Sequence, residues 1–180
     1  MSQKGFELFD EMGERTMKSI VVYYSMNGNC EMVAEKIAKL TGADILRIEP
    51  VKSYPDKGAK KFIWGGKSAV MGEMPPLKPY EFDADKYDCV IIGFPVWASN
   101  ITPPVRTFVK DNREALKDKK IASFACQAGS GAEKAFGRLK EALGRESIDP
   151  TLVLIDPKTR QNDENENRIS RFADSIEALL

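Results

Sequence analysis

Short runs of β-branched and aromatic residues alternate along this chain with segments whose apolar residues recur every three or four positions. The runs predict buried strands, and the segments between them predict amphipathic helices. Strands that alternate with helices usually pair in parallel, with helices covering both faces of the sheet. We therefore expect an α/β fold with a doubly wound five-stranded parallel sheet, its strands at 19–25, 44–50, 87–93, 119–126 and 151–156.

The predicted domain covers residues 18–180, and residues 1–17 are expected to be a loosely ordered N-terminal extension. A long insertion at about 51–82 interrupts the alternation; it is rich in proline and has a helical stretch at 58–72. A connection of this length usually has a function or carries structure of its own. Four helices are predicted in the domain outside this insertion. The first ends near Leu40, the second spans 103–112, the third spans 131–143, and the last begins at Asn165.

The overall composition narrows the range of partners. The 27 basic and 27 acidic residues cancel, so nucleic acid is not an expected partner. No apolar run reaches the roughly 18 residues of a membrane span, and no apolar signal-peptide region is recognisable at the N-terminus. Cys30, Cys89 and Cys126 form no C-x-x-C motif and are odd in number, which favours a reducing cytoplasmic location over a disulfide framework.

The chain contains no histidine, and this limits its chemistry more than any residue that is present. A Ser-His-Asp triad, a Cys-His dyad and imidazole metal ligands are all excluded. Three scattered cysteines cannot form a structural zinc site alone. We therefore expect neither a metal site nor catalytic side chains, and any chemistry should come from a bound cofactor.

Three predicted strands end in loops of small and polar residues, and ligands of open parallel sheets bind at the carboxyl ends of the strands. The first loop, SMNGNC, precedes a helix and combines a glycine with hydroxyl, amide and backbone N–H groups, the elements of a phosphate cradle. It matches neither the Walker A nor the G-x-G-x-x-G motif. The alternative is a turn without ligand, in which Asn29 caps the helix. The candidate residues are Ser25, Met26, Asn27, Gly28, Asn29 and Cys30.

The second loop places Trp97 just after a buried strand, where an indole either closes the core or offers a platform to a flat ligand. Its small polar neighbours favour the platform. None of the three loops contains a charged residue, so amides and hydroxyls, rather than ion pairs, should hold an anionic group. An uncharged pocket with one aromatic face and one phosphate cradle is typical of a flavin mononucleotide (FMN) site. The second and third loops contribute Pro95, Val96, Trp97, Ala98, Ser99 and Asn100, and Gln127, Ala128, Gly129 and Gly131.

The sequence resembles the flavodoxin-like family of FMN-binding proteins from about Lys18 to its C-terminus. The phosphate-loop pattern of that family, Ser/Thr-x-Thr-Gly-Asn-Thr, is met by Ser25, Gly28 and Asn29, whereas Asn27 and Cys30 stand where threonines are usual. GFPVWASNITPPVRTF and CQAGSGA resemble its two flavin loops. The resemblance implies strand order 2-1-3-4-5, non-covalently bound FMN and a redox function located at the residues named above.

Three functions stay open at this point. The first is an NAD(P)H-dependent reductase of quinone-like acceptors, the second an electron carrier that docks to protein redox partners, and the third a ligand-free interaction module. Carriers of this family are typically strongly acidic, whereas this chain has a pI near 6.4, which disfavours steering to a basic partner. The expected partners are FMN with NAD(P)H or a redox protein, and a homodimer is left open. We expect Cys126 to be inert, because no resolving cysteine is visible, and Trp64 either to cover the flavin or to pin the insertion.

Overall fold

The computed structural model describes residues 17–55 and 60–180, and in them a five-stranded parallel sheet forms the centre of the fold. The strand order is β2-β1-β3-β4-β5, which confirms the predicted doubly wound α/β fold. Every neighbouring pair runs parallel. The strands are β1 (Ser19–Tyr23), β2 (Asp44–Arg47), β3 (Cys89–Pro95), β4 (Lys120–Gln127) and β5 (Thr151–Ile155).

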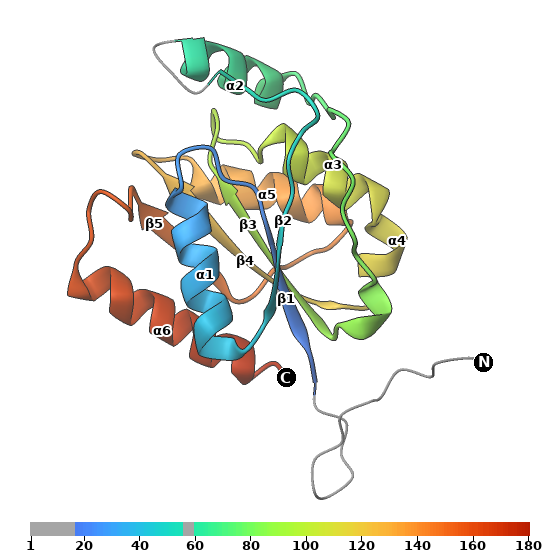
Figure 1. The fold of residues 1–180 in the computed structure, drawn as a ribbon, viewed down its shortest axis with the longest axis vertical. Helices are drawn as coiled ribbons and strands as arrows, with labels where there is room; N and C mark the ends of the chain where they lie inside the picture. The colour runs from blue at the N-terminus through green and yellow to red at the C-terminus, as the bar shows by residue number, and fades with distance from the viewer. Residues whose placement is uncertain (1–16, 56–59) are drawn as a thin grey trace, which may run out of the picture.

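Helices cover both faces of this sheet (Figure 1). One face packs against α1 (Asn29–Thr41) and α6 (Asp163–Glu177), and the other against α3 (Pro103–Asp111) and α5 (Ala132–Leu143). The short elements η1 (Ala84–Lys86) and α4 (Arg113–Leu116) complete the second layer, and α2 (Lys60–Val70) lies apart, beyond the carboxyl ends of the strands. Among the described residues, no helix is both long and apolar enough to cross a membrane.

The alternation of side chains along β3 divides the core into two clusters. Cys89 and Ile91 point to the cluster under α1 and α6, whereas Val90, Ile92 and Phe94 point to the cluster under α3 and α5. Successive side chains of a strand face opposite sides, so a strand covered on both faces must be apolar throughout. This explains why the sequence of β3 is a continuous apolar run instead of an alternating pattern.

Several element boundaries differ from the prediction. β3 continues to Pro95, two residues past the predicted end at Gly93, because β4 pairs with it along this stretch. β1 ends at Tyr23, and α6 begins at Asp163 because the Asn162 side chain accepts a hydrogen bond from Asn165 N at 2.8 Å. This Asn162 cap sets the start of the helix two residues before the predicted one.

The chain on either side of α2 in the 51–82 segment lies close together in the structure. The two ends of this segment pair side by side: Val51 N donates to Pro76 O at 2.9 Å, and Lys78 N donates to Glu49 O at 2.8 Å. Between them α2 confirms a helix in the described part of the stretch predicted at 58–72. Residues 58 and 59 of that stretch, and residues 1–16 of the predicted N-terminal extension, lie outside the described residues.

Candidate functional site

A cavity of about 160 Å³ opens at the carboxyl ends of β1, β3 and β4. All three polar loops singled out in the sequence contribute to its lining. The predicted residues that line it are Ser25, Met26, Asn27, Asn29, Cys30, Pro95, Val96, Trp97, Ala98, Gln127 and Ala128. Gly66, Cys126 and Asp156 also line it and were not predicted. The convergence of the loops follows from the parallel sheet, because all its strands end at the same edge.

The other predicted residues lie around the cavity without lining it. Ser99 and Asn100 face a neighbouring groove. Gly131 lies behind Ser99, and Gly129 has open space where a side chain would stand. Gly28 belongs to the first loop, but a Cβ on it would point at the Lys158 amine, 2.6 Å away. The end of the Lys158 side chain therefore occupies the place where a Cβ of Gly28 would stand.

The first loop turns sharply into α1 without a side-chain cap. Gly28 adopts a left-handed conformation with φ 83°, which favours glycine, and its N–H donates to Ser25 Oγ at 3.1 Å. Asn29 is already helical and Gly28 is the N-cap residue, so the alternative in which Asn29 caps the helix is wrong. The first helical hydrogen bond runs from Met32 N to Gly28 O, and the N–H groups of Asn29, Cys30 and Glu31 precede it. These groups have no intrahelical partner, and a helix terminus of this kind is suited to an anion.

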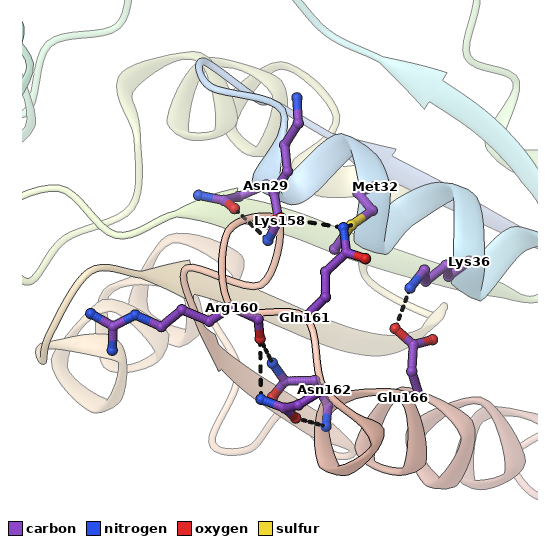
Figure 2. A network of polar contacts seen from close by, with 9 residues as sticks. Asn29, Met32, Lys36, Lys158, Arg160, Gln161, Asn162 and Glu166 are labelled. Atoms are coloured by element: carbon purple, nitrogen blue, oxygen red, sulfur yellow. Dashed lines mark hydrogen bonds and ion pairs between the residues drawn. The ribbon is translucent and has the colours of Figure 1, made fainter.

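A fourth loop, which follows β5, brings positive charge to this terminus. Lys158 N donates to Asn29 Oδ1 at 3.0 Å, and Figure 2 shows the Lys158 side chain running along the loop that precedes α1. In the same network Lys36 of α1 pairs with Glu166 of α6. The sequence predicts that amides and hydroxyls, rather than ion pairs, hold an anionic group. That prediction considers only the first three loops and leaves out this fourth loop. The rule applied to the first three loops, that strands of one sheet end at one edge, would have found it.

A second cation approaches the first loop from β2. The Arg47 guanidinium donates to Ser25 O at 3.3 Å and pairs with Glu31 and Glu49. Partial burial acts to lower the pKa of Arg47, but Glu31, Tyr23 and Glu49 together raise it above its ordinary value. Arg47 therefore serves mainly to fix the loop, whereas Lys158 makes no ion pair among the described residues and is free to meet an anion.

The second loop is a tight hairpin at the rim of the cavity. Trp97 N donates to Asn100 O at 3.2 Å, and Asn100 N donates to Trp97 O at 3.0 Å. The two residues between them, Ala98 and Ser99, have φ of 48° and 58°. Two consecutive positive φ values are the pattern of a type I′ turn, which normally takes Asn-Gly. Holding Ala and Ser there costs free energy, and backbone strain of this kind gathers at functional sites.

Trp97 is half-buried and held in place by aromatic rings. It packs edge-on against Tyr24, with centroids 5.8 Å apart, and against Tyr54, at 5.1 Å. From α2, Gly65 lies so close that a Cβ on it would stand 3.1 Å from the indole. The insertion thus reaches the site through Gly65 and Gly66. Trp64 itself is 58% exposed and is not among the residues that line the cavity.

The third loop brings two thiols together that are far apart in the sequence. Cys30 and Cys126 both line the cavity, and the Cys30 thiol interacts directly with that of Cys126. Cys126 thus has a second cysteine beside it in the cavity lining, and its expected inertness stays a prediction. Burial raises the pKa of Cys30, so its thiol stays protonated at neutral pH, and a protonated thiol is a poor nucleophile. In the same loop, Gln127 Oε1 accepts from Ala132 N at 3.0 Å and caps α5.

Comparison with known proteins assigns the chain to one family. The sequence profile of the flavodoxin family matches residues 18–171, and the chain belongs to that family. Its fold is similar to that of a protein from Bacteroides eggerthii assigned as a flavoprotein (TM-score 0.69, 23% identity, covering 88% of this chain and 97% of the other). It is also similar to a flavoprotein from Lactobacillus acidophilus in complex with FMN (TM-score 0.67, 20% identity, covering 80% of this chain and 97% of the other). A third similar structure is that of oxidised flavodoxin 2 from Bacillus cereus (TM-score 0.58, 21% identity, covering 91% of this chain and 99% of the other).

Proposed function

We propose that the chain binds one FMN non-covalently in the cavity described above. The observation that carries this proposal is the N-terminus of α1, which has no side-chain cap and offers N–H donors at one end of a cavity walled by Trp97. Beside these donors lies the Lys158 amine, which makes no ion pair among the described residues. A phosphate group needs such donors, and an aromatic ring system needs such a wall. The similar L. acidophilus flavoprotein, in complex with FMN, supports the same reading.

Each loop has its own part in holding the cofactor. The N–H groups of residues 29–31 and the Lys158 amine hold the phosphate, and Ser25 fixes the turn through its bond to Gly28 N. The hairpin 97–100 and the backbone of 127–129 border the flavin ring. The residues from Ala128 to Ser130 are exposed, so their backbone groups are available to the polar edge of the ring.

The function built on this cofactor is electron transfer by a small NAD(P)H-dependent reductase of quinone-like acceptors. Bound FMN accepts and returns electrons, and the chain has to bind it, orient it and admit the second substrate. Within the part of the chain that the structure describes, Asp156 is the only carboxylic acid that lines the cavity. Hydride transfer to a flavin needs no acid or base from the protein, so no catalytic side chain is assigned.

An electron carrier that docks to protein partners is the second candidate. Equal numbers of acidic and basic residues disfavour it, because docking by electrostatic steering depends on net charge. The position of α2 also favours the reductase, since Gly66 of this helix adds to the wall of the cavity. The three cysteines are all buried and free, which fits the proposed reducing cytoplasm.

Two measurements test the proposal. Heating the purified protein and separating the released flavin by chromatography should give FMN alone, in a ratio of about one per chain. FAD, or no flavin, would contradict the binding proposal. Steady-state NAD(P)H oxidation with a quinone, compared with reduction by a ferredoxin reductase, then separates the two functions. A reductase turns over with NAD(P)H and a quinone, whereas a carrier needs the ferredoxin reductase to become reduced.

A further inference from the structure

A second concave surface adjoins the proposed flavin cavity. We name it the α2–α5 groove; it lies between the end of α2, α3 and α5, and two overlapping hollows of about 590 and 400 Å³ form it. Ala98, at the tip of the strained hairpin, lines both the cavity and the groove. A ligand in the groove would therefore extend directly to the rim of the cavity. Most of the polar lining is cationic or amide: Asn100, Arg106, Lys134 and Arg138, with Glu141 as the one carboxylate.

Arg106 is the central cation of this groove. Its guanidinium donates to Asn100 Oδ1 at 2.8 Å and to Ala69 O at 3.3 Å, so two neutral acceptors fix its direction. Over the described residues it has no carboxylate partner. Arginine offers five donors in a rigid fork. The two bonds to protein oxygens therefore leave further donors available to a ligand.

Among the described residues, acids neutralise only one of the three cations that line the groove. Glu141 pairs with Arg138 at 2.9 Å and is the only acid in the lining, whereas Lys134 makes no ion pair among the described residues. Partial burial and the positive charge of Arg138 both lower the pKa of Arg106. Two like charges that face one hollow repel each other unless an anion lies between them. The groove thus has a net positive charge on a chain whose total charge is zero.

We propose that the α2–α5 groove binds the phosphate groups of the nicotinamide dinucleotide that reduces the flavin. This inference rests on the proposed function, because it is the reductase that needs such a donor. A dinucleotide carries anionic phosphates at a distance from its reactive ring, so the ring can enter the cavity while the phosphates stay in a neighbouring cationic groove. Quinones carry no such charge. Guanidinium groups bind phosphate oxygens in a bidentate, charge-assisted manner, which suits the fork of Arg106.

The test measures binding directly instead of turnover. FMN-loaded protein is titrated with NADP⁺, NAD⁺ and inorganic pyrophosphate by calorimetry, for the wild type, Arg106→Gln, Lys134→Gln and the control Lys110→Gln. Lys110 is an exposed lysine on α3 that does not line the groove. We expect Arg106→Gln to weaken dinucleotide binding about tenfold or more, as the loss of a charged hydrogen bond implies. Lys134→Gln should weaken it less, and Lys110→Gln should leave it unchanged.

The possible outcomes separate this inference from the flavin proposal, because flavin content and thermal melting are recorded for every variant. Lys134 is exposed and makes no ion pair among the described residues, so its variant tests the groove even where Arg106→Gln lowers stability. Equal dinucleotide affinity in the wild type and both groove variants, with FMN bound, would overturn the groove and leave the flavin proposal intact. Binding of pyrophosphate without binding of either dinucleotide would also overturn it. Absence of FMN would contradict the proposed function instead.

Discussion

Gly131, which precedes α5, lies directly against Ser99 in the hairpin at the rim of the cavity. A Cβ on Gly131 would stand 3.0 Å from Ser99 Cα and 2.6 Å from its Oγ, and Gly131 has φ 108°. The close approach and the positive φ both require glycine. Because of this contact, the start of α5 supports the two strained residues of the hairpin, and the second and third loops act as one unit.

Gly131→Ala should therefore lower both stability and flavin binding. We expect a loss of about 1–3 kcal/mol in the free energy of unfolding, from strain at positive φ and displacement of Ser99. Gly129→Ala is the matched control, since a Cβ at Gly129 meets nothing within 4 Å and its φ is not positive. Urea unfolding and FMN titration of both variants provide the measurement. Equal effects of the two substitutions would show that the contact with Ser99 has no such role.

Removal of the Lys158 charge should weaken FMN binding without unfolding the protein. Lys158 is exposed, and its fixed contact with Asn29 is made by its backbone N–H, which a substitution keeps. We expect Lys158→Gln to raise the dissociation constant of FMN roughly tenfold or more, the value of one charged hydrogen bond to phosphate. The difference should shrink at high salt. Lys39→Gln, at the other end of α1, is the control, and equal FMN affinity in both variants would exclude Lys158 from the phosphate site.

Thr102 is fully buried at the start of α3, and its hydroxyl has no hydrogen-bond partner within the described part of the chain. A buried unpaired hydroxyl costs about 1–3 kcal/mol, and valine has nearly the same shape. Thr102→Val should leave stability unchanged or raise it by about 1 kcal/mol. Thr107→Val should lower it by about 1 kcal/mol, because Thr107 Oγ1 donates to Pro75 O at 2.8 Å. Chemical denaturation of both variants decides; a loss at Thr102 as large as at Thr107 would indicate a hidden partner.

The protein should lose stability in alkaline solution as buried thiols ionise. Burial raises the pKa of the Cys89 thiol from the ordinary value of 9.0 to about 11. A raised pKa means that the folded state favours the protonated thiol. The stabilisation is therefore complete below pH 9 and disappears as the pH rises to 11, a change of about 3 kcal/mol. Burial shifts the pKa of Cys30 in the same direction.

Cys89→Ala isolates the contribution of Cys89 to this pH dependence. The variant loses packing at every pH, but it should lose less additional stability than the wild type between pH 9 and 11. Free energies of unfolding from urea titrations at pH 7, 9 and 10.5 give the comparison. Parallel curves for the two proteins would show that Cys89 does not titrate in this range.

Most of the fold could be predicted from the sequence, because apolar runs and helical spacing within short segments indicate its strands and helices. The apolar runs of β3 and β4 and the helical spacing of α1 and α5 are visible within ten to fifteen residues. The boundary errors have local causes that a pattern does not show: Asn162 caps α6 ahead of the expected start, and partner strands extend β3 to Pro95. Three of the site's loops could also be predicted, since loops that follow parallel strands meet at one edge.

By itself, the sequence determined the α/β class, the absence of histidine chemistry and the three polar loops, because composition and periodicity are properties of the chain alone. Only the tertiary structure decided which distant side chains meet: Lys158 with Gly28, Cys30 with Cys126, and Arg106 with Arg138 over the α2–α5 groove. It also decided that Asn29 is not a cap and that Trp64 faces solvent. Such pairs depend on strand order, on the path of the 51–82 segment and on side-chain direction. Each of these is set by packing between segments that are remote in the sequence, so no local pattern records it.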